Sequence, residues 1–374
     1  MKHILIVTSY APSLINFRLS FIKKLLNRGF RVSVASPKNK FTQNRKKILK
    51  NLGVNIYIFS LSSVGLSFFK DLKSILAILK IVRYCKPNIV ISYTIKPVIY
   101  AGLVLNFFKK IVYYPMITGL GYVFINKDFI NHKILKIFII VLYRLSLKSA
   151  KKIIFQNKDD QNLFLKLKIV KQKKLSDVVS GSGVDLKEYP ISKLPKKPVF
   201  LMVARLLVDK GVREYVEAAK IVLSNYPNTI FYLAGYLDKN PSGITADELG
   251  SWINKGVIRY LGEMKSVQSA LKSCRYFVLP SYREGTPRSS LEALSSGRPI
   301  ITTDAPGCRE TVVHKKNGLL VPIKNSVALA DAMVTLLREK EKIVKRMAHE
   351  SYLLAKSKYE INKVNKKMLA IMKL

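Results

Sequence analysis

The chain has 374 residues, a length that suits two domains of roughly 150 to 200 residues each. Apolar residues make up 49% of it, so it can bury two cores, and its formal net charge of +42 belongs to a folded protein and not to a disordered basic tail. Its three cysteines lie far apart and have no histidine at ligand spacing. This excludes a disulfide framework and a structural zinc site and indicates a reduced, cytosolic protein.

Short apolar runs rich in β-branched residues alternate with helical periodicity through the first half of the chain. This alternation is typical of parallel βαβ units in a doubly wound sheet. The opening run is too short for a signal peptide, and glycines and serines interrupt the uncharged stretch Asn51–Phe69, so we expect neither export nor a transmembrane span. The expected strands are Ile4–Thr8, Val32–Ala35, Ile56–Phe59, Ile89–Tyr93, Val112–Met116 and Ile153–Gln156.

Basic residues are concentrated in this first half. Residues 1–190 contain 34 Lys and Arg against 7 Asp and Glu, whereas residues 191–374 contain 31 against 16. From Met1 to Lys70 there are 13 basic residues and no acidic one. A genome rich in A and T explains many lysines but not the absence of carboxylates, so the pattern favours an anionic partner surface.

Three segments of the first half combine an apolar helical face with basic residues: Phe17–Gly29, Leu66–Tyr84 and Phe129–Lys152. The simplest interpretation is that these helices pack on a sheet and leave their lysines in solvent. Basic amphipathic helices also suit an anionic membrane surface. We therefore expect a cytoplasmic protein that is peripheral on the inner face of the cell membrane.

The strand pattern restarts after Ile191–Pro198, a segment whose prolines and charges suit a linker. Further strands are expected at 198–206, 229–235, 257–262, 276–281 and 299–304, and after Asn325 only helical periodicity remains. We predict an α/β protein with two Rossmann-like, doubly wound parallel-sheet domains, 1–190 and 191–374, that face a central cleft. The C-terminal helices can cross back to the first domain.

The first cluster of chemically distinctive residues is A-R-L-L-V-D-K-G at 204–211, which follows an expected strand and precedes a helix. Ligands of such sheets bind at the carboxyl ends of the strands. Two cations, Arg205 and Lys210, beside a helix start suit a diphosphate. A structural salt bridge to Asp209 is the simpler alternative.

The second cluster is R-E-G-T-P-R-S-S-L-E-A at 283–293. Gly285 and Pro287 place Glu284 on a loop, and Glu292 falls near a helix start. Carboxylates accept hydrogen bonds from pairs of hydroxyls, so a sugar and a ribose are natural ligands. The simpler alternative is a solvated loop carboxylate and a second one favoured by the helix dipole.

Two glycine motifs follow other expected strands, S-G-S-G-V-D at 180–185 and T-G-L-G at 118–121. Their glycines, which include Gly183, Gly119 and Gly121, permit close approach to the backbone, but each motif alone is weakly specific. The pair Asp159-Asp160 lacks the D-x-D form of metal-dependent transferases. We therefore expect no metal and no cofactor.

Taken together, these motifs resemble a known family. The order of G-S-G-V-D, R-L-x-x-D-K-G, E-G-T-P-R-S-S-L-E, P-I-I-T-T-D-A-P-G-C-R-E and N-G-L-L-V resembles the second domain of the family 4 retaining glycosyltransferases, which have the GT-B fold. In the first domain N-F-R at 16–18, S-Y-T-I-K-P at 92–97 and I-T-G-L-G-Y at 117–122 resemble the branch that builds bacterial surface polysaccharides and lipid-linked glycans. That branch includes N-acetylgalactosaminyl transferases acting on undecaprenyl-diphosphate-linked bacillosamine.

The resemblance implies roles for individual residues. Arg205 and Lys210 would hold the donor diphosphate and stabilise the charge on the leaving nucleotide. Glu292 would bind the nucleotide ribose, and Glu284 the hydroxyls of the donor sugar. The family's reaction is drawn as a front-face displacement in which the leaving phosphate accepts the proton, so no protein base is required. The catalytic residues implied in this way are Arg205, Lys210 and Glu284. The donor-binding residues are Gly183, Arg205, Lys210, Glu284, Gly285, Thr286, Pro287, Arg288 and Glu292.

The first domain departs from the family pattern in two places. Many relatives have a histidine in the region of Ser92–Pro97 and glycines in the region of Tyr10–Asn16, and this chain has neither. Lys96 could contact a phosphate of the donor or the acceptor instead. The candidates for binding the acceptor or its phosphates are Asn16, Arg18, Lys96, Gly119 and Gly121.

We predict an enzyme that moves a hexose or N-acetylhexosamine from a UDP-sugar, such as UDP-GalNAc or a related donor, to a lipid-diphosphate-linked sugar, with retention of configuration. Its partners would be the nucleotide sugar, the lipid-linked acceptor and an anionic membrane surface. The alternatives are a family 4 transferase with a soluble, phospholipid or glycolipid acceptor, and a sugar-nucleotide epimerase of the same fold. A nucleic-acid-binding protein is the remote alternative, because the chain has no recognised nucleic-acid-binding motif.

Overall fold

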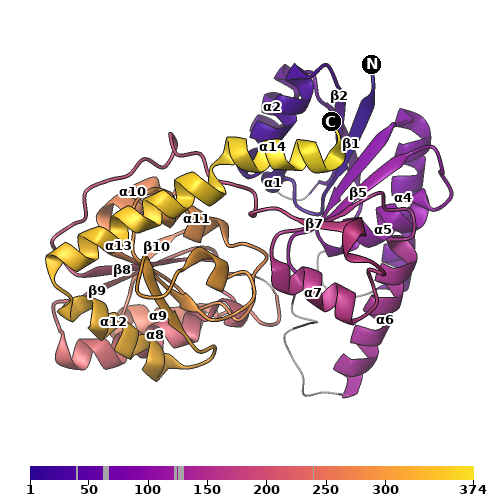
Figure 1. Ribbon diagram of the computed structural model, residues 1–374. Helices are drawn as coiled ribbons and strands as arrows, with labels where there is room; N and C mark the ends of the chain where they lie inside the picture. Colours follow the sequence, from indigo (N-terminus) through magenta and orange to yellow (C-terminus); the bar gives the residue numbers. More distant parts are fainter. Residues whose placement is uncertain (39–40, 62–66, 122–123, 125–129, 239) are drawn as a thin grey trace. The chain divides into compact units, whose positions relative to one another are not determined.

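The computed structural model describes residues 1–38, 41–61, 67–121, 124, 130–238 and 240–374, with the backbone alone at 130–132. These residues form two compact units (Figure 1). The first unit comprises Met1–Ser182 together with Val364–Leu374, and the second comprises Gly183–Lys363.

The first unit is built on a seven-stranded parallel sheet with the order β3-β2-β1-β4-β5-β6-β7. Its central strand β4 has the bounds expected from its apolar run. The strands are β1 (His3–Val7), β2 (Arg31–Pro37), β3 (Asn55–Phe59), β4 (Ile89–Tyr93), β5 (Val112–Ile117), β6 (Ile153–Phe155) and β7 (Ser176–Val178).

Helices cover both faces of this sheet. Ile4 and Ile6 of β1 face a core formed with α1, α2, α3 and α14, whereas Leu5 and Val7 face a core formed with α4 to α7. Because both faces are buried, the strands are almost continuously apolar. The helices are α1 (Pro12–Asn16), α2 (Leu19–Asn27), α3 (Gln43–Asn51), α4 (Phe68–Cys85), α5 (Ile95–Leu105), α6 (Ile130–Ser146), α7 (Lys158–Lys166) and the 3-10 turn η2 (Lys173–Leu175).

Helix α6 ends earlier than the segment Phe129–Lys152 predicts. After Ser146 the chain turns toward the sheet, and the Lys151 N–H donates to the Tyr113 carbonyl at 2.9 Å. The end of α6 packs closely on α5 because Gly102 has no side chain: a Cβ there would lie 2.1 Å from the Ser146 carbonyl oxygen.

Residues 364–374 complete the first unit, and all but the last two of them lie in the last helix, α14 (Ile361–Met372). Met368, Leu369 and Met372 are buried in the same core as Leu14 and Phe21. The Tyr114 hydroxyl donates to the Met372 carbonyl at 2.8 Å. One face of the first sheet is thus covered partly by its own helices and partly by the C-terminal segment.

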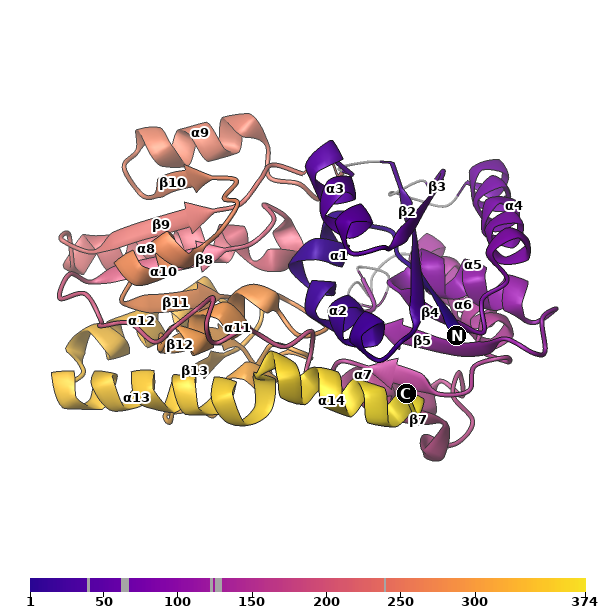
Figure 2. The same ribbon diagram turned by 90° about the horizontal axis from the view of Figure 1, so that it is seen from above.

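The second unit has a six-stranded parallel sheet with the order β10-β9-β8-β11-β12-β13, and Figure 2 shows the strands side by side in this order. A single core surrounds it. Its strands are β8 (Val199–Val203), β9 (Ile230–Ala234), β10 (Arg259–Gly262), β11 (Tyr276–Leu279), β12 (Ile300–Thr303) and β13 (Gly318–Val321). Its helical elements are η3 (Val208–Lys210), α8 (Val212–Asn225), α9 (Ala246–Asn254), α10 (Gln268–Ser273), α11 (Arg288–Ser295), η4 (Arg309–Thr311), α12 (Ser326–Arg338), α13 (Glu341–Leu354) and the π-helical turn η5 (Ala355–Tyr359).

The chain enters the second unit at Gly183, whereas the sequence places the boundary at residue 190. The reason is local pairing: the Val184 N–H donates to the Tyr359 carbonyl at 2.7 Å, and the Ile361 N–H donates to the Val184 carbonyl at 3.0 Å. Tyr189 is also buried in the second core. The proline-rich segment Ile191–Pro198 therefore lies within the second unit.

Two parallel-sheet, Rossmann-like units are the fold class that the sequence predicts. In the described part of the chain, every helix is too short or too polar to span a bilayer.

Candidate donor site

The predicted donor-site residues of the second unit lie at the carboxyl ends of its central strands. Arg205 follows β8, Glu284 follows β11, and Lys210 ends the 3-10 turn that leads into α8. In an open parallel sheet the carboxyl edge is where ligands bind, because loops and helix starts meet there.

Lys210 and Glu284 form an ion pair at this edge. The Lys210 Nζ lies 2.7 Å from Oε1 of Glu284, and the two side chains are only 12% and 18% exposed. The Ser281 hydroxyl donates to the same carboxylate oxygen at 3.0 Å. Asp209, the partner that the simpler interpretation named, lies farther away, at 4.0 Å from the Lys210 Nζ.

This environment keeps Lys210 charged. Burial lowers the pKa of Lys210, but the carboxylates of Glu284 and Asp209 oppose it, and the net result is a pKa above the ordinary lysine value. A buried cation that is permanently charged suits a diphosphate, which carries the opposite charge.

Two glycines hold the loops of this pair together. Gly211, with φ +73°, lies against Pro280, and a Cβ on Gly211 would be 2.2 Å from the Pro280 carbonyl oxygen. Gly307, with φ +77°, lies against Glu284 in the same way: a Cβ on Gly307 would be 2.3 Å from the Glu284 carbonyl oxygen. The Glu284 N–H also donates to the Pro306 carbonyl at 2.9 Å. The A-P-G segment at 305–307 therefore fixes the backbone that carries Glu284.

Arg205 is more exposed than Lys210. Its side chain is 49% exposed, and its guanidinium lies 3.1 Å from Oδ2 of Asp238. Asp238 also accepts a hydrogen bond from the Asn240 N–H at 3.1 Å, which fixes the carboxylate. Arg205 is thus held at the carboxyl edge of β8 with its cationic group accessible to a ligand.

Arg288 and Glu292 form a second cluster on α11. The Arg288 Nε donates to Oε1 of Glu292 at 2.9 Å, and a terminal nitrogen of Arg288 donates to the Gly183 carbonyl. Burial raises the pKa of Glu292, and Arg288 opposes this shift. The G-S-G-V-D motif and the helix start, which are far apart in the sequence, are therefore joined by one arginine.

The start of α11 completes this edge of the unit. Gly285 and Pro287 are buried, Thr286 is partly exposed, and Pro287 directly precedes the first helical residue. The amino end of a helix carries a partial positive charge and N–H groups without partners inside the helix, so it attracts phosphate. That Gly285, Thr286 and Pro287 bind the donor stays a prediction.

In the first unit the carboxyl edges of β1, β4 and β5 are adjacent, and Ser9, Thr94, Gly119 and Gly121 follow these strands. The hydroxyls of Ser9 and Thr94 are 2.7 Å apart. Thr94 has φ +70°, a conformation that side chains rarely adopt, and both glycines also have positive φ. Thr94 thus occupies the region where the expected histidine is missing.

The charged candidates of the first unit have partners of their own. Arg18 is buried, with its guanidinium carbon 4.2 Å from the centre of the Tyr93 ring. The Lys96 Nζ lies 2.9 Å from Oδ1 of Asp71. Asn16 is exposed at the end of α1. A phosphate contact of Lys96 stays a prediction, and it would compete with Asp71.

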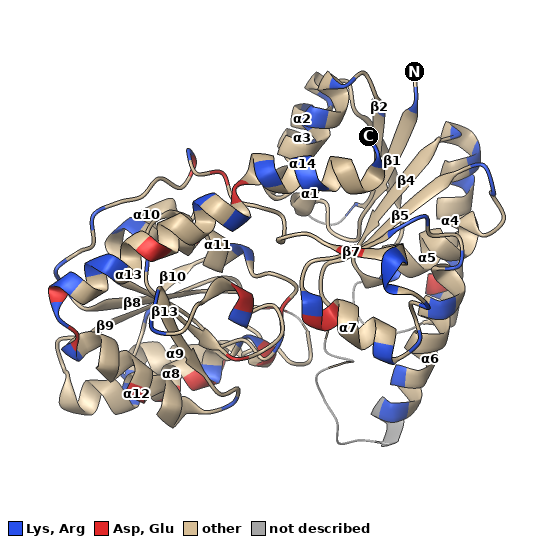
Figure 3. Ribbon diagram, in the orientation of Figure 1, with Lys and Arg blue, Asp and Glu red and all other residues tan. Residues whose placement is uncertain are grey.

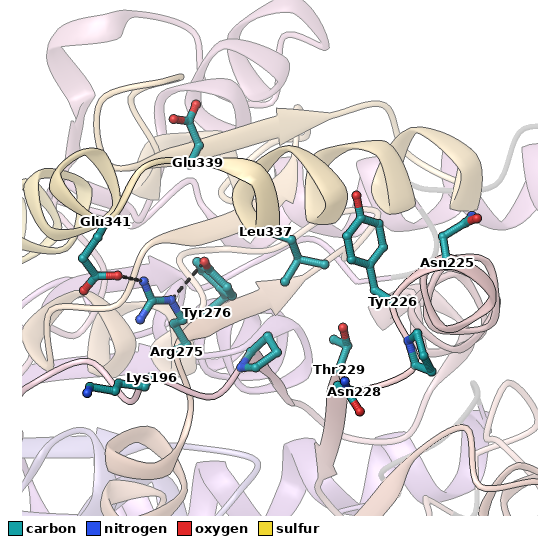
Figure 4. Close-up of a pocket in the computed structure, with 12 residues that line it drawn as sticks. Lys196, Asn225, Tyr226, Asn228, Thr229, Arg275, Tyr276, Leu337, Glu339 and Glu341 are labelled. Carbon is teal, nitrogen blue, oxygen red and sulfur yellow. Dashed lines mark hydrogen bonds and ion pairs between the residues drawn. The ribbon is translucent and has the colours of Figure 1, made fainter.

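A cavity of about 480 Å³ lies at the opposite edge of the second sheet, near residues that precede β8, β9 and β11 (Figure 4). Its most buried cation, Arg275, is already paired with Glu341 and donates to the Pro195 carbonyl at 2.7 Å. This cavity is therefore separate from the carboxyl-edge site. Among the residues that the structure describes, no three His, Cys, Asp or Glu side chains gather as metal ligands.

Sequence reasoning missed several partners of the site residues. Asp238 is 33 residues from Arg205, and Asp71 is 25 residues from Lys96. Ser281 was not singled out although it lies only three residues before Glu284. Its position at the end of the expected strand 276–281 was the one signal that could have identified it.

Two Rossmann-like units, with cations and carboxylates at the carboxyl edge of the second sheet, define a GT-B fold. A solved structure agrees: the crystal structure of Anabaena HepE in complex with UDP matches the whole of both chains with a TM-score of 0.76 at 18% identity.

Sequence comparisons identify the family. A family model described as glycosyl transferase 4-like matches residues 4–157, and one described as glycosyl transferases group 1 matches residues 197–339. The chain is 31% identical over 345 residues to N,N'-diacetylbacillosaminyl-diphospho-undecaprenol alpha-1,3-N-acetylgalactosaminyltransferase of Campylobacter jejuni, with 88% of each chain covered. It is 26% identical over 291 residues to UDP-Gal:alpha-D-GlcNAc-diphosphoundecaprenol alpha-1,3-galactosyltransferase of Escherichia coli, covering 74% of this chain and 73% of the relative. The chain belongs to this family of glycosyltransferases, and the resemblance drawn from its motifs is confirmed.

Proposed function

We propose that the protein transfers a hexose or N-acetylhexosamine from a UDP-sugar, UDP-GalNAc or a related donor, to a sugar carried on undecaprenyl diphosphate, with retention of the anomeric configuration. The observation that carries the proposal is the buried Lys210–Glu284 pair at the carboxyl edge of the second sheet. The similarity to transferases whose names specify undecaprenyl-diphosphate acceptors supports the choice of acceptor. The product would belong to a surface polysaccharide or another lipid-linked glycan.

The donor would bind with its diphosphate against Lys210 and Arg205. Without a donor, Lys210 is paired with Glu284. A bound diphosphate supplies a second anion for Lys210, so Glu284 becomes available to accept hydrogen bonds from the sugar hydroxyls. Glu292, held by Arg288, would accept hydrogen bonds from the ribose hydroxyls.

The reaction breaks the bond between the sugar C1 and the phosphate oxygen and forms a bond from C1 to the acceptor hydroxyl oxygen on the same face. The acceptor proton passes to the leaving phosphate oxygen. Lys210 and Arg205 stabilise the negative charge that develops on the diphosphate, a contribution typically worth about 3–4 kcal/mol for each preorganised donor. We propose that this step needs no divalent metal.

The acceptor is a lipid, so the enzyme would work at the inner face of the cell membrane as a peripheral protein. Ser9, Thr94, Gly119 and Gly121 are at the sheet edge where the acceptor would bind, with Asn16, Arg18 and Lys96 as further candidates. The excess of basic residues in the first unit supports contact with anionic lipids and with the acceptor diphosphate.

The test is release of nucleoside diphosphate from a panel of UDP- and GDP-sugars, with and without a membrane extract that contains undecaprenyl-diphosphate glycans, and again in EDTA. We expect release that requires one UDP-sugar and the lipid extract and that survives EDTA. Transfer to a soluble glycan without lipid would refute the acceptor, and loss of activity in EDTA would refute the metal-free step.

A further inference from the structure

Helix α6 presents an apolar stripe to solvent. Ile139 and Tyr143 face the core, but five apolar side chains on the rest of the helix are exposed at helical spacing. Ile134 and Ile137 are the most exposed of them, at 63% and 62%. The stripe consists of Ile134, Ile137, Phe138, Val141 and Leu145. An ordinary surface helix would carry polar residues there, so this face is built for an apolar partner.

The start of α4 adds two aromatic side chains. Phe68 and Phe69 are 77% and 82% exposed, and their rings pack edge to face with centroids 5.6 Å apart. Leu72 and Leu76 continue the apolar line along α4 and are also exposed. Helices α4 and α6 pack on either side of α5 on the same face of the first sheet (Figure 1).

Both helices begin at the carboxyl edge of the first sheet, because each connects the carboxyl end of one strand to the amino end of the next parallel strand. Helix α6 has 17 residues and is about 25 Å long, whereas β6 has three residues and spans about 10 Å. The first turns of α6 therefore extend past the sheet (Figure 1). Phe68 and Phe69 at the start of α4, and Ile134, Ile137 and Phe138 in the first half of α6, thus lie toward the same end of the unit as Ser9, Thr94 and the glycines that follow β5.

The charged residues of α6 and of the two residues after it are all basic, whereas α4 has one acidic residue, Asp71, which is paired with Lys96. Residues 130–148 contain Lys133, Lys136, Arg144 and Lys148 and no Asp or Glu. Figure 3 shows basic residues along α6 without an acidic one. Two copies of α6 packed against each other would bring these cations together without carboxylates to pair with them, which disfavours a dimer. An anionic bilayer supplies both an apolar layer and negative charge.

We infer that the stripe of α6, with Phe68 and Phe69 of α4, is the surface through which the first unit inserts into an anionic phospholipid bilayer. This inference rests on the proposed function and adds the residues that make the contact. The apolar side chains enter the boundary between headgroups and acyl chains, and the lysines of α6 bind the headgroups. The acceptor edge of the sheet then faces the membrane that carries the acceptor lipid.

The experiment is flotation of the full chain with vesicles of phosphatidylcholine that contain 0 or about 30% phosphatidylglycerol. The double variant Ile137→Glu/Phe138→Glu is compared with Phe69→Glu and with the control Phe107→Glu. Phe107 is 85% exposed and follows α5, at the opposite end of the first unit from Phe69. Because all four side chains are exposed, these substitutions should leave the fold intact, which circular dichroism verifies.

We expect the native chain to bind only the anionic vesicles. The partition coefficient should fall at least about 100-fold in Ile137→Glu/Phe138→Glu and about tenfold in Phe69→Glu, and change by less than about threefold in Phe107→Glu. Equal losses in Phe69→Glu and Phe107→Glu would show a general charge effect and overturn the inference. A native chain that forms a dimer broken by Ile137→Glu/Phe138→Glu, without binding vesicles, would identify a second copy as the partner and also overturn it.

Tryptophan fluorescence gives an independent readout of insertion. The native chain has one tryptophan, Trp252, which is buried in the second unit and supplies a constant background. Phe138→Trp should shift its emission to shorter wavelength with anionic vesicles and be quenched by brominated acyl chains, whereas Phe107→Trp should not. Absence of quenching in Phe138→Trp would refute insertion.

These measurements need no donor, so their outcome is separate from that of the proposed function. With a water-soluble short-chain acceptor analogue, Ile137→Glu/Phe138→Glu should retain the native rate, and with acceptor in vesicles it should lose most of it. If the native chain binds anionic vesicles but transfers no sugar to either acceptor, the proposed function fails and the membrane surface stands.

Discussion

Replacing Lys210 by methionine separates the catalytic role proposed for it from its structural one. At 2.7 Å and an effective dielectric constant of about 20, the attraction between Lys210 and Glu284 is about 6 kcal/mol, and desolvation of the two side chains offsets most of it. Leaving one partner of a buried pair uncompensated costs about 3–5 kcal/mol. Since Glu284 keeps 18% exposure and the hydrogen bond from Ser281, we expect Lys210→Met to lower the free energy of unfolding by about 2–3 kcal/mol.

For a unit the size of Gly183–Lys363, that loss lowers the Tm by about 5–10 °C. Loss of one preorganised charge donor should also lower the turnover about 100- to 1000-fold. The double variant Lys210→Met/Glu284→Gln also removes the charge of the carboxylate that has lost Lys210, so it should recover most of the stability while its turnover stays low.

The assays are thermal unfolding followed by circular dichroism and release of UDP from the preferred donor with saturating acceptor. Glu284→Gln alone serves as the control, because it keeps the cation and neutralises its partner. Recovery of turnover in the double variant would show that Lys210 only neutralises Glu284. Near-normal turnover in Lys210→Met would likewise sink the assignment of Lys210 to the diphosphate.

Three further predictions concern other parts of the molecule. Gly307→Ala places a Cβ 2.3 Å from the Glu284 carbonyl at φ +77°, so it should lower the Tm and reduce turnover at least tenfold; unchanged kinetics in a UDP-release assay would contradict the role of this contact. Burial raises the pKa of Glu292, so this carboxylate takes up a proton at a higher pH than an ordinary carboxyl group does. As the pH is lowered, the affinity for UDP, measured by calorimetry, should therefore fall at a higher pH than it would with an ordinary carboxylate, and Glu292→Gln should flatten this profile. Lys96→Met should raise the KM for the lipid acceptor at least fivefold and leave the KM for the donor unchanged. Asp71→Asn removes the partner of Lys96 and should not raise the acceptor KM. Equal effects of the two substitutions would show that the pair is only structural.

The strands in the middle of each sheet were predictable because both of their faces are buried. Ile89–Tyr93 matches β4 at both ends. The strands β7 and β13 were not given residue bounds among the expected strands, since they have only three and four residues, and β7 includes Asp177. An apolar run this short does not distinguish a strand from a loop.

Lys210 and Glu284 could be singled out as donor-site candidates from local motifs, because each lies in a short, distinctive segment. Their pairing was not predictable, since they are 74 residues apart and meet only when β8 and β11 become neighbours in the sheet. The same holds for Arg288 and Gly183, which are separated by 105 residues. A motif identifies a side chain, whereas the strand order decides which side chain it faces.

The C-terminal segment has a consequence for how the chain folds during synthesis. The core that contains Leu14 and Phe21 also includes Met368, Leu369 and Met372, so part of one face of the first sheet stays uncovered until these residues leave the ribosome. The second unit, whose core lies within Gly183–Lys363, can fold before that moment. The first unit to be synthesised is thus the last to be completed, and a nascent chain that stops before residue 364 exposes apolar surface that a chaperone can bind.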